Sequence, residues 1–89
     1  MEKRIGSALI LLQDNTEITR LNEILSRHAQ IIIGRQCIPL REKKINIISL
    51  VLEGSTDEIG ALTGQIGRLA GIEIKSVVTK FKEQSNDKA

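Results

Sequence analysis

Apolar and polar positions recur along the chain in a pattern that predicts four strands and two helices. Runs rich in apolar and β-branched residues predict extended segments, and apolar residues three or four positions apart predict helices. The strands are expected at residues 4–13, 31–38, 45–53 and 72–81, with helices between residues 14 and 28 and between residues 55 and 71. The second strand is expected to stop at Pro39, which lacks a backbone N–H for the ladder. This β-α-β-β-α-β order is the split arrangement of ferredoxin-like folds.

Polar residues and glycine mark the expected ends of the helices. Asp14 or Asn15 is expected to cap the first helix, which should end near His28. Ser55 and Glu58 are spaced as a capping box, in which each side chain bonds to the other residue's backbone N–H. Gly71 is expected at the C′ position that ends the second helix.

Three glycines lie inside the second predicted helix: Gly60, Gly64 and Gly67. At about 100° per residue they gather on a face roughly 150° from the centre of the apolar stripe. Each interior glycine costs about 1 kcal/mol relative to alanine, and core packing does not explain that cost on the far side. We therefore predict that a partner chain, a ligand or a neighbouring backbone approaches this face. Thr63 and Arg68 flank the glycines and are expected to supply polar contacts.

The expected sheet is apolar on both faces. In the first and third strands both alternate sets of side chains are apolar, whereas a sheet with one solvated face alternates apolar with polar residues. In an α+β, ferredoxin-like sandwich, two helices cover one face of a four-stranded antiparallel sheet and leave the other open. An exposed apolar patch usually marks an interface, which predicts a homo-oligomer, a dimer or tetramer, that uses the open face, an edge strand or both. A monomer with scattered surface aliphatics is the competing interpretation.

The composition indicates one small domain without a membrane segment. The chain has 89 residues, 40% hydrophobic but only 1% aromatic, with Phe81 as its single aromatic residue. We expect a single ferredoxin-like domain over residues 1–81 and a disordered polar tail over residues 82–89. No stretch approaches the roughly 18 apolar residues of a membrane span. The single Cys37 excludes an intramolecular disulfide and is typical of a reducing compartment, so we expect a cytoplasmic protein.

The reactive residues do not form a catalytic or metal-binding constellation. His28 is the only histidine and is expected to interact with the dipole at a helix C-terminus. Cys37 is isolated and is expected to be buried as a small apolar residue. A site assembled from His28 or Cys37 across subunits stays open. Because no nucleophile, base and orienting group stand out, we predict a protein that is not an enzyme and has no metal or cofactor.

Basic residues gather around the second strand and the hairpin after it, at Arg35, Arg41, Lys43 and Lys44. A solvated turn is the usual meaning of such a cluster, and the net charge of +2 is too small to indicate nucleic acid by itself. Ferredoxin-like RNA-binding domains stack bases on sheet aromatics, which this sheet lacks apart from Phe81 near its end. Direct nucleic-acid binding is therefore disfavoured. Binding through the basic hairpin stays an alternative, as does a ligand-free assembly scaffold.

The segment from Ile45 to Val77 resembles a known family. Its capped glycine helix, with residues Gly60–Gly71, and the segment Ile72–Lys75 after it resemble the corresponding segments of small proteins named iron-only hydrogenase system regulators. The opening residues 1–4 and the hairpin residues 39–42 also resemble that family. The resemblance covers roughly residues 1–80, and the glycine helix is its most specific part.

This resemblance implies an ACT-like regulatory module. The family is related in fold to ACT domains and to the effector-binding domain of the nickel-responsive repressor, which implies an oligomer that senses a small molecule or docks a protein partner. Residues 13–16 lack the glycine that ACT domains place where amino acids bind, and the chain has one histidine and one cysteine where the nickel repressor needs several histidines and a cysteine. Neither site therefore transfers. No helix-turn-helix or ribbon segment for operator binding is present in the sequence.

Overall fold

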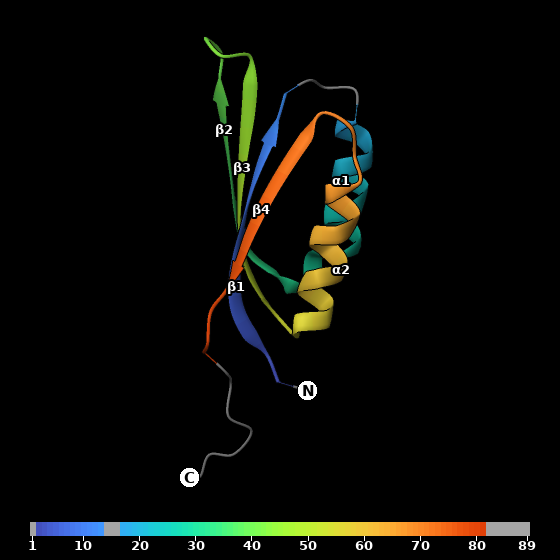
Figure 1. Ribbon diagram of the computed structural model, residues 1–89, viewed down its shortest axis with the longest axis vertical. Helices are drawn as coiled ribbons and strands as arrows, with labels where there is room; N and C mark the ends of the chain where they lie inside the picture. Colours follow the sequence, from blue (N-terminus) through green and yellow to red (C-terminus); the bar gives the residue numbers. More distant parts are fainter. Residues whose placement is uncertain (1, 14–16, 82–89) are drawn as a thin grey trace.

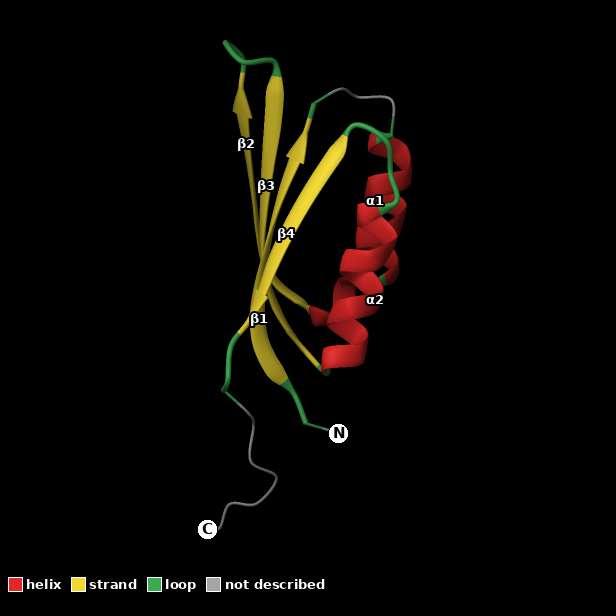
Figure 2. Cartoon of the chain, in the orientation of Figure 1, coloured by secondary structure: helices red, strands yellow, loops and turns green. Residues whose placement is uncertain are grey.

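The computed structural model describes residues 2–13 and 17–81. Its elements are β1 (Arg4–Leu12), α1 (Ile18–Arg27), the short 3-10 helix η1 (Ala29–Ile31), β2 (Ile32–Leu40), β3 (Ile45–Gly54), α2 (Thr56–Gly67) and β4 (Ile72–Val78). The strands form one four-stranded antiparallel sheet in the order β2-β3-β1-β4. Both helices lie on the same side of that sheet (Figures 1 and 2). The predicted α+β, ferredoxin-like fold is confirmed.

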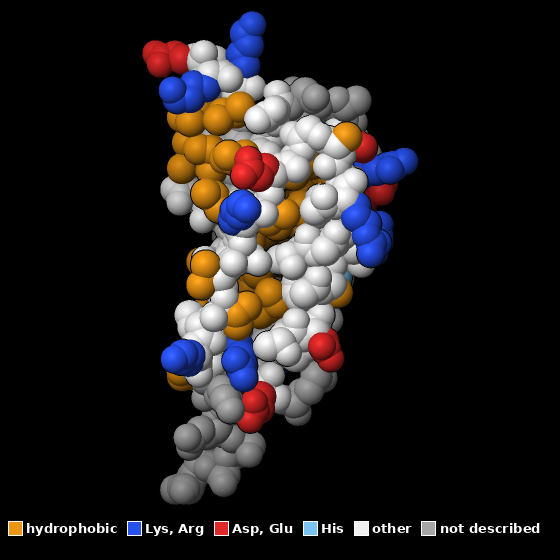
Figure 3. Space-filling model, in the orientation of Figure 1, with side chains coloured by type: hydrophobic (Ala, Val, Ile, Leu, Met, Phe, Trp, Pro, Cys, Tyr) orange, Lys and Arg blue, Asp and Glu red, His pale blue; other side chains and the backbone are white. Residues whose placement is uncertain are grey.

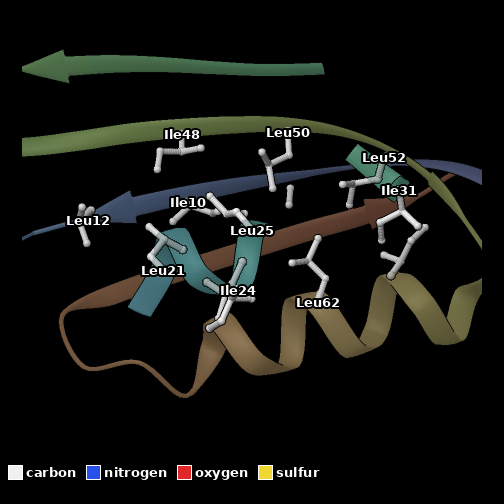
Figure 4. Packing of buried hydrophobic residues seen from close by; sticks show 13 residues of the cluster. Ile10, Leu12, Leu21, Ile24, Leu25, Ile31, Ile48, Leu50, Leu52 and Leu62 are labelled. Atoms are coloured by element: carbon white, nitrogen blue, oxygen red, sulfur yellow. The ribbon is translucent and has the colours of Figure 1, made fainter. Parts of the chain in front are cut away.

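The core lies between the helices and the inner face of the two central strands. The register places Ala8 opposite Leu50 and Ile10 opposite Ile48, so apolar side chains from β1 and β3 stand on one face. Fully burying one aliphatic side chain of this size contributes about 1.5–3 kcal/mol, and no aromatic residue is needed. Figure 4 shows these side chains meeting those of the helices. The buried cluster consists of Ala8, Ile10, Leu12, Leu21, Ile24, Leu25, Ile31, Ile48, Leu50, Leu52, Ile59, Leu62 and Ile66.

Helix α2 begins where its capping box predicts and ends earlier than expected. The Glu58 N–H donates to Ser55 Oγ at 3.1 Å, and the Ser55 N–H donates to Glu58 Oε1 at 2.8 Å. The helix ends at Gly67 with Arg68 as its C-cap, so the assignment of Gly71 to the C′ position is wrong. Gly71 does adopt the left-handed φ of 74°, but in the turn to β4, where its carbonyl accepts from Gln13 N at 3.0 Å.

Helix α1 begins without a side-chain cap and ends where predicted. Glu17 occupies its N-cap position and makes no side-chain capping hydrogen bond. The predicted caps, Asp14 and Asn15, lie outside the described residues. His28 is the C-cap, and its N–H bonds to the Ile24 carbonyl at 3.2 Å. Within the described ranges, no helix is long and apolar enough to cross a bilayer.

Two strand ends differ from expectation. β2 continues through Pro39, which stands opposite Asn46, and ends at Leu40. A strand at the edge of a sheet has one side that needs no ladder donor, so proline is tolerated there. β4 stops at Val78 and not at Phe81. Beyond Val78, the N–H and the hydroxyl of Thr79 both donate to the Ile5 carbonyl, each at 2.8 Å, so one more backbone bond to β1 follows the last strand residue. The tail predicted for residues 82–89 lies outside the described residues.

Candidate functional site

The glycine flank of α2 (Gly60, Gly64 and Gly67) extends from the side of the helix that faces β4, at Gly67, to its exposed outer surface, at Gly60 and Gly64, and lies away from α1. A Cβ built at Gly67 would be 3.7 Å from Ile74 Cγ2 of β4, whereas Gln65 Oε1, on the opposite flank, is 3.4 Å from His28 Nε2 at the end of α1. A Cβ at Gly60 or Gly64 would meet nothing within 4 Å. Among the described residues the chain supplies no close neighbour for these two glycines. Of the three predicted neighbours, a backbone segment of the same chain is therefore not found at Gly60 and Gly64, and a partner chain or a ligand stays a prediction.

The two flanking polar residues point to different surroundings. The Thr63 hydroxyl donates to the Gly60 carbonyl at 3.3 Å, which satisfies it within the helix. Arg68 is exposed at the C-cap and lines a groove between α2 and α1. The structure therefore gathers Thr63 with the glycines and places Arg68 on the α1 side.

The groove between α1 and α2 carries more positive than negative charge. It has a volume of about 440 Å³, and Ile24 at its base is buried. Arginine guanidinium groups match carboxylate and phosphate geometry, so this groove suits an anionic group. This groove is not among the sites predicted from the sequence. Its one signal there is the seven-residue spacing of Arg20 and Arg27, which places both on one face of a helix. The lining residues are Arg20, Glu23, Ile24, Arg27, Gln65, Arg68 and Leu69.

The sheet face opposite the helices is mainly apolar on its central strands and is uncovered by any described part of the chain. On β4 the same face carries Glu73 and Lys75, which stand opposite Leu11 and Leu9. Leu9 is 47% exposed, Val51 42% and Val77 65%, and the register places them on the same face as Leu11, Ile38 and Ile47. Figure 3 shows hydrophobic side chains gathered along the sheet, at the left of the view. The prediction that two helices leave an apolar sheet face open is confirmed.

The basic residues do not form one cluster. Arg41, Lys43 and Lys44 are exposed in the turn between β2 and β3, where Lys44 takes a left-handed φ of 57°. Arg35 lies on β2 and donates to Asn22 Oδ1 of α1 at 3.4 Å. Phe81, which is 57% exposed, follows the end of β4 and is not part of the sheet. The sheet therefore has no aromatic surface on which bases could stack.

The histidine and the cysteine belong to different elements. His28 is the half-buried C-cap of α1, as predicted, and contacts Gln65. Cys37 is exposed on β2, so the prediction that it is buried is wrong. The reason is topological, because β2 is the edge strand of the sheet. Within residues 2–13 and 17–81, no three His, Cys, Asp or Glu residues group as a metal site.

Comparison with known proteins identifies the family. A family model described as "TM1266-like: Iron-only hydrogenase system regulator, putative" matches residues 4–76. The chain belongs to this family. The structure of uncharacterized protein TM1266 from Thermotoga maritima is 37% identical, with a TM-score of 0.82 over 88% of this chain and 99% of that chain. Divalent ion tolerance protein CutA1 from Ehrlichia chaffeensis is 15% identical, with a TM-score of 0.46 over 96% of this chain and 87% of that chain, a likeness too distant to bear on function. No curated protein matches significantly.

The family match confirms the resemblance first seen in the glycine helix. Its range begins at Arg4, the first residue of β1, and ends at Ser76 in β4. Both helices, the glycine flank and the open sheet face therefore fall within the TM1266-like region. The family description assigns a regulatory role and names no ligand.

Proposed function

We propose that this TM1266-like protein is a non-catalytic, oligomeric regulatory module of an iron-only hydrogenase system, which acts by binding a small effector or docking on a protein partner. The observation that carries the proposal is the open apolar sheet face, with Leu9, Val51 and Val77 between 42% and 65% exposed. A contiguous patch of this kind on a small protein indicates an interface. The family description supports the regulatory part of the proposal.

Recognition would use the surface around α2. Gly60, Gly64 and Gly67 let another molecule approach the helix backbone, because nothing in the described chain occupies the space over Gly60 and Gly64. Thr63 and Arg68 would add polar contacts on either side. An effector bound here would shift an assembly or docking equilibrium by as much as its affinities for the two states differ.

Native mass spectrometry of freshly purified protein tests this proposal. We expect an oligomeric mass, a dimer or tetramer, together with any small molecule that survives purification. A monomeric mass at all concentrations, with nothing bound, would overturn the oligomeric module. Tight DNA or RNA binding that falls steeply with salt would instead indicate the basic hairpin as a nucleic-acid site.

Gly64→Leu tests the close approach to α2. The substitution should leave the monomer folded, since a Cβ at this position meets nothing within 4 Å, and the helix gains propensity of up to about 1 kcal/mol. The larger side chain should nevertheless disrupt assembly or partner binding. Gly64→Ala is the matched control, because it adds the same propensity with only one methyl group. Unchanged oligomeric mass and partner binding in Gly64→Leu would refute the close approach.

A further inference from the structure

The two edges of the sheet differ in their capacity to pair with another strand. The β2 edge contains Pro39 and an irregular register between Ile32 and Gly34. The β4 edge contains no proline, no glycine and no register shift. Among the described residues, β4 has a strand neighbour only on the side of β1. A regular, unpaired edge strand of this kind is a template for another chain.

The hydrogen bonds at the two ends of β4 show which of its backbone N–H and C=O groups point toward β1 and which point toward the free edge. Gln13 N donates to the Gly71 carbonyl at 3.0 Å, and Thr79 N donates to the Ile5 carbonyl at 2.8 Å. These bonds show that the odd-numbered positions bond to β1, because bonded positions alternate in an antiparallel ladder. The residues that direct their N–H and C=O groups to the free edge are therefore Ile72, Ile74, Ser76 and Val78.

We propose that the partner at this edge is a second copy of this chain, with β4 antiparallel to β4 about a two-fold axis at Ile74. In this register Ile74 stands opposite its own copy and Ile72 stands opposite Ser76. Glu73 then stands opposite Lys75 at two symmetric places. These two pairs occupy non-hydrogen-bonded positions, where side chains approach most closely and opposite charges stabilise the pairing.

Neighbouring registers are less favourable. An axis at Glu73 would place two glutamates opposite each other, and an axis at Lys75 would place two lysines opposite each other, both of which destabilise a strand pair. An axis at Ser76 would place Lys75 opposite Val77 and Glu73 opposite Thr79, which lies beyond the end of β4. The charge pattern of the strand therefore selects the Ile74 register.

The glycine flank of α2 lies on this same side of the molecule. Gly67 is next to Ile74, with 3.7 Å between its built Cβ and Ile74 Cγ2. A two-fold axis normal to the sheet at Ile74 would place the two α2 helices side by side, with Gly67 of each helix beside the axis. Small residues allow helix backbones to approach closely. Figure 3, in which β4 and α2 lie in front, shows a largely uncharged surface on this side of α2. The inference rests on the proposed oligomer and adds to it an edge contact through β4, distinct from the contact expected at the open sheet face.

Cysteine cross-linking tests the register directly. Cys37 is exposed, so the variants Ile74→Cys and Ser76→Cys are made in a Cys37→Ser background. Ile74→Cys should form a disulfide-linked dimer on mild oxidation, because its Cα would lie about 5.5 Å from that of its copy. Ser76→Cys should not, since the two copies of residue 76 would be about 13 Å apart along the strands. Faster cross-linking of Ser76→Cys, or none by Ile74→Cys in a protein with wild-type circular dichroism, would overturn the register.

Charge reversal provides an independent measurement. Lys75→Glu turns two attractive pairs into two repulsive ones and should weaken this contact about tenfold. Glu73→Lys should weaken it similarly, and a mixture of the two variants should form the heterodimer preferentially, as seen from the masses in native spectra. Lys80→Glu, outside β4, is the matched control. Wild-type affinity in Lys75→Glu would refute the Ile74 register.

The experiments distinguish a failure of the β4 edge contact from a failure of the proposed function. An oligomeric native mass combined with control-like behaviour of the cysteine and charge variants would refute the β4 edge contact and leave the proposed function intact. A monomeric mass for the wild type would refute both.

Discussion

Replacing Leu9 and Val51 with threonine should dissociate the proposed oligomer across the open sheet face without unfolding the chain. Leu9 lies on β1 and Val51 on the neighbouring β3, both on the face away from the helices. Threonine has the β-branched shape that strands favour. The variant therefore removes apolar surface from the face while it preserves the sheet.

The expected loss follows from the exposure of the two side chains. Complete burial of leucine or valine contributes about 1.5–3 kcal/mol, and 47% of Leu9 and 42% of Val51 remain to be buried. Each would contribute about 1 kcal/mol on burial in an interface. Each side chain occurs twice in a symmetric interface, and threonine retains one methyl group. The net loss in the free energy of association is therefore about 3 kcal/mol, which raises the dissociation constant on the order of 100-fold.

Sedimentation velocity over a range of concentrations measures this change. The double variant should show a lower mass at concentrations where the wild type is assembled, while circular dichroism stays unchanged. Phe81→Ser is the matched control, because Phe81 is 57% exposed but lies beyond the last strand, and it should assemble normally. A wild-type dissociation constant in Leu9→Thr/Val51→Thr would show that the open face is not the contact surface.

Two further predictions concern elements that hold the candidate surfaces in place. Ser55→Ala removes one half of the capping box and should lower stability by about 1 kcal/mol, seen as a melting temperature roughly 4–8 °C lower by calorimetry; an unchanged melting temperature would contradict the role of the cap. Gly6→Ala places a Cβ 2.8 Å from the Val77 carbonyl and should cost about 1–3 kcal/mol, with faster amide exchange in β4. Gly60→Ala, where nothing lies within 4 Å, is its control and should melt no lower than the wild type.

The parts of the fold that the sequence predicts well have local causes. The capping box at Ser55 needs only residues three positions apart, and α2 begins there. The errors occur where a neighbour in space decides. Pro39 is tolerated because β2 is an edge strand, and Cys37 is exposed for the same reason. Gly71 has the expected backbone conformation, but the turn that uses it begins only after α2 has ended at Gly67.

The candidate surfaces also divide into one that local sequence predicts and others that depend on neighbours in space. The open sheet face is predictable because both alternate sets in the central strands are apolar, and two helices cover only one of them. The direction of the glycine flank is not predictable from the helix alone, because it depends on which side α1 packs, as the Gln65 contact with His28 shows. The groove between α1 and α2 also requires both helices, since Arg68 of the α2 C-cap lines it together with Arg20 and Arg27 of α1 only in the folded chain.

The irregularity of the β2 edge has a consequence for how far assembly can proceed. If both edges of the sheet could pair, copies would add head to tail and the sheet would grow without limit, as in a fibre. Pro39 and the interrupted register near Gly34 make the β2 edge a poor template. Pairing through β4 alone would occupy the regular edge of both copies. A dimer joined through β4 would therefore expose only the two irregular β2 edges, which disfavour the addition of further copies.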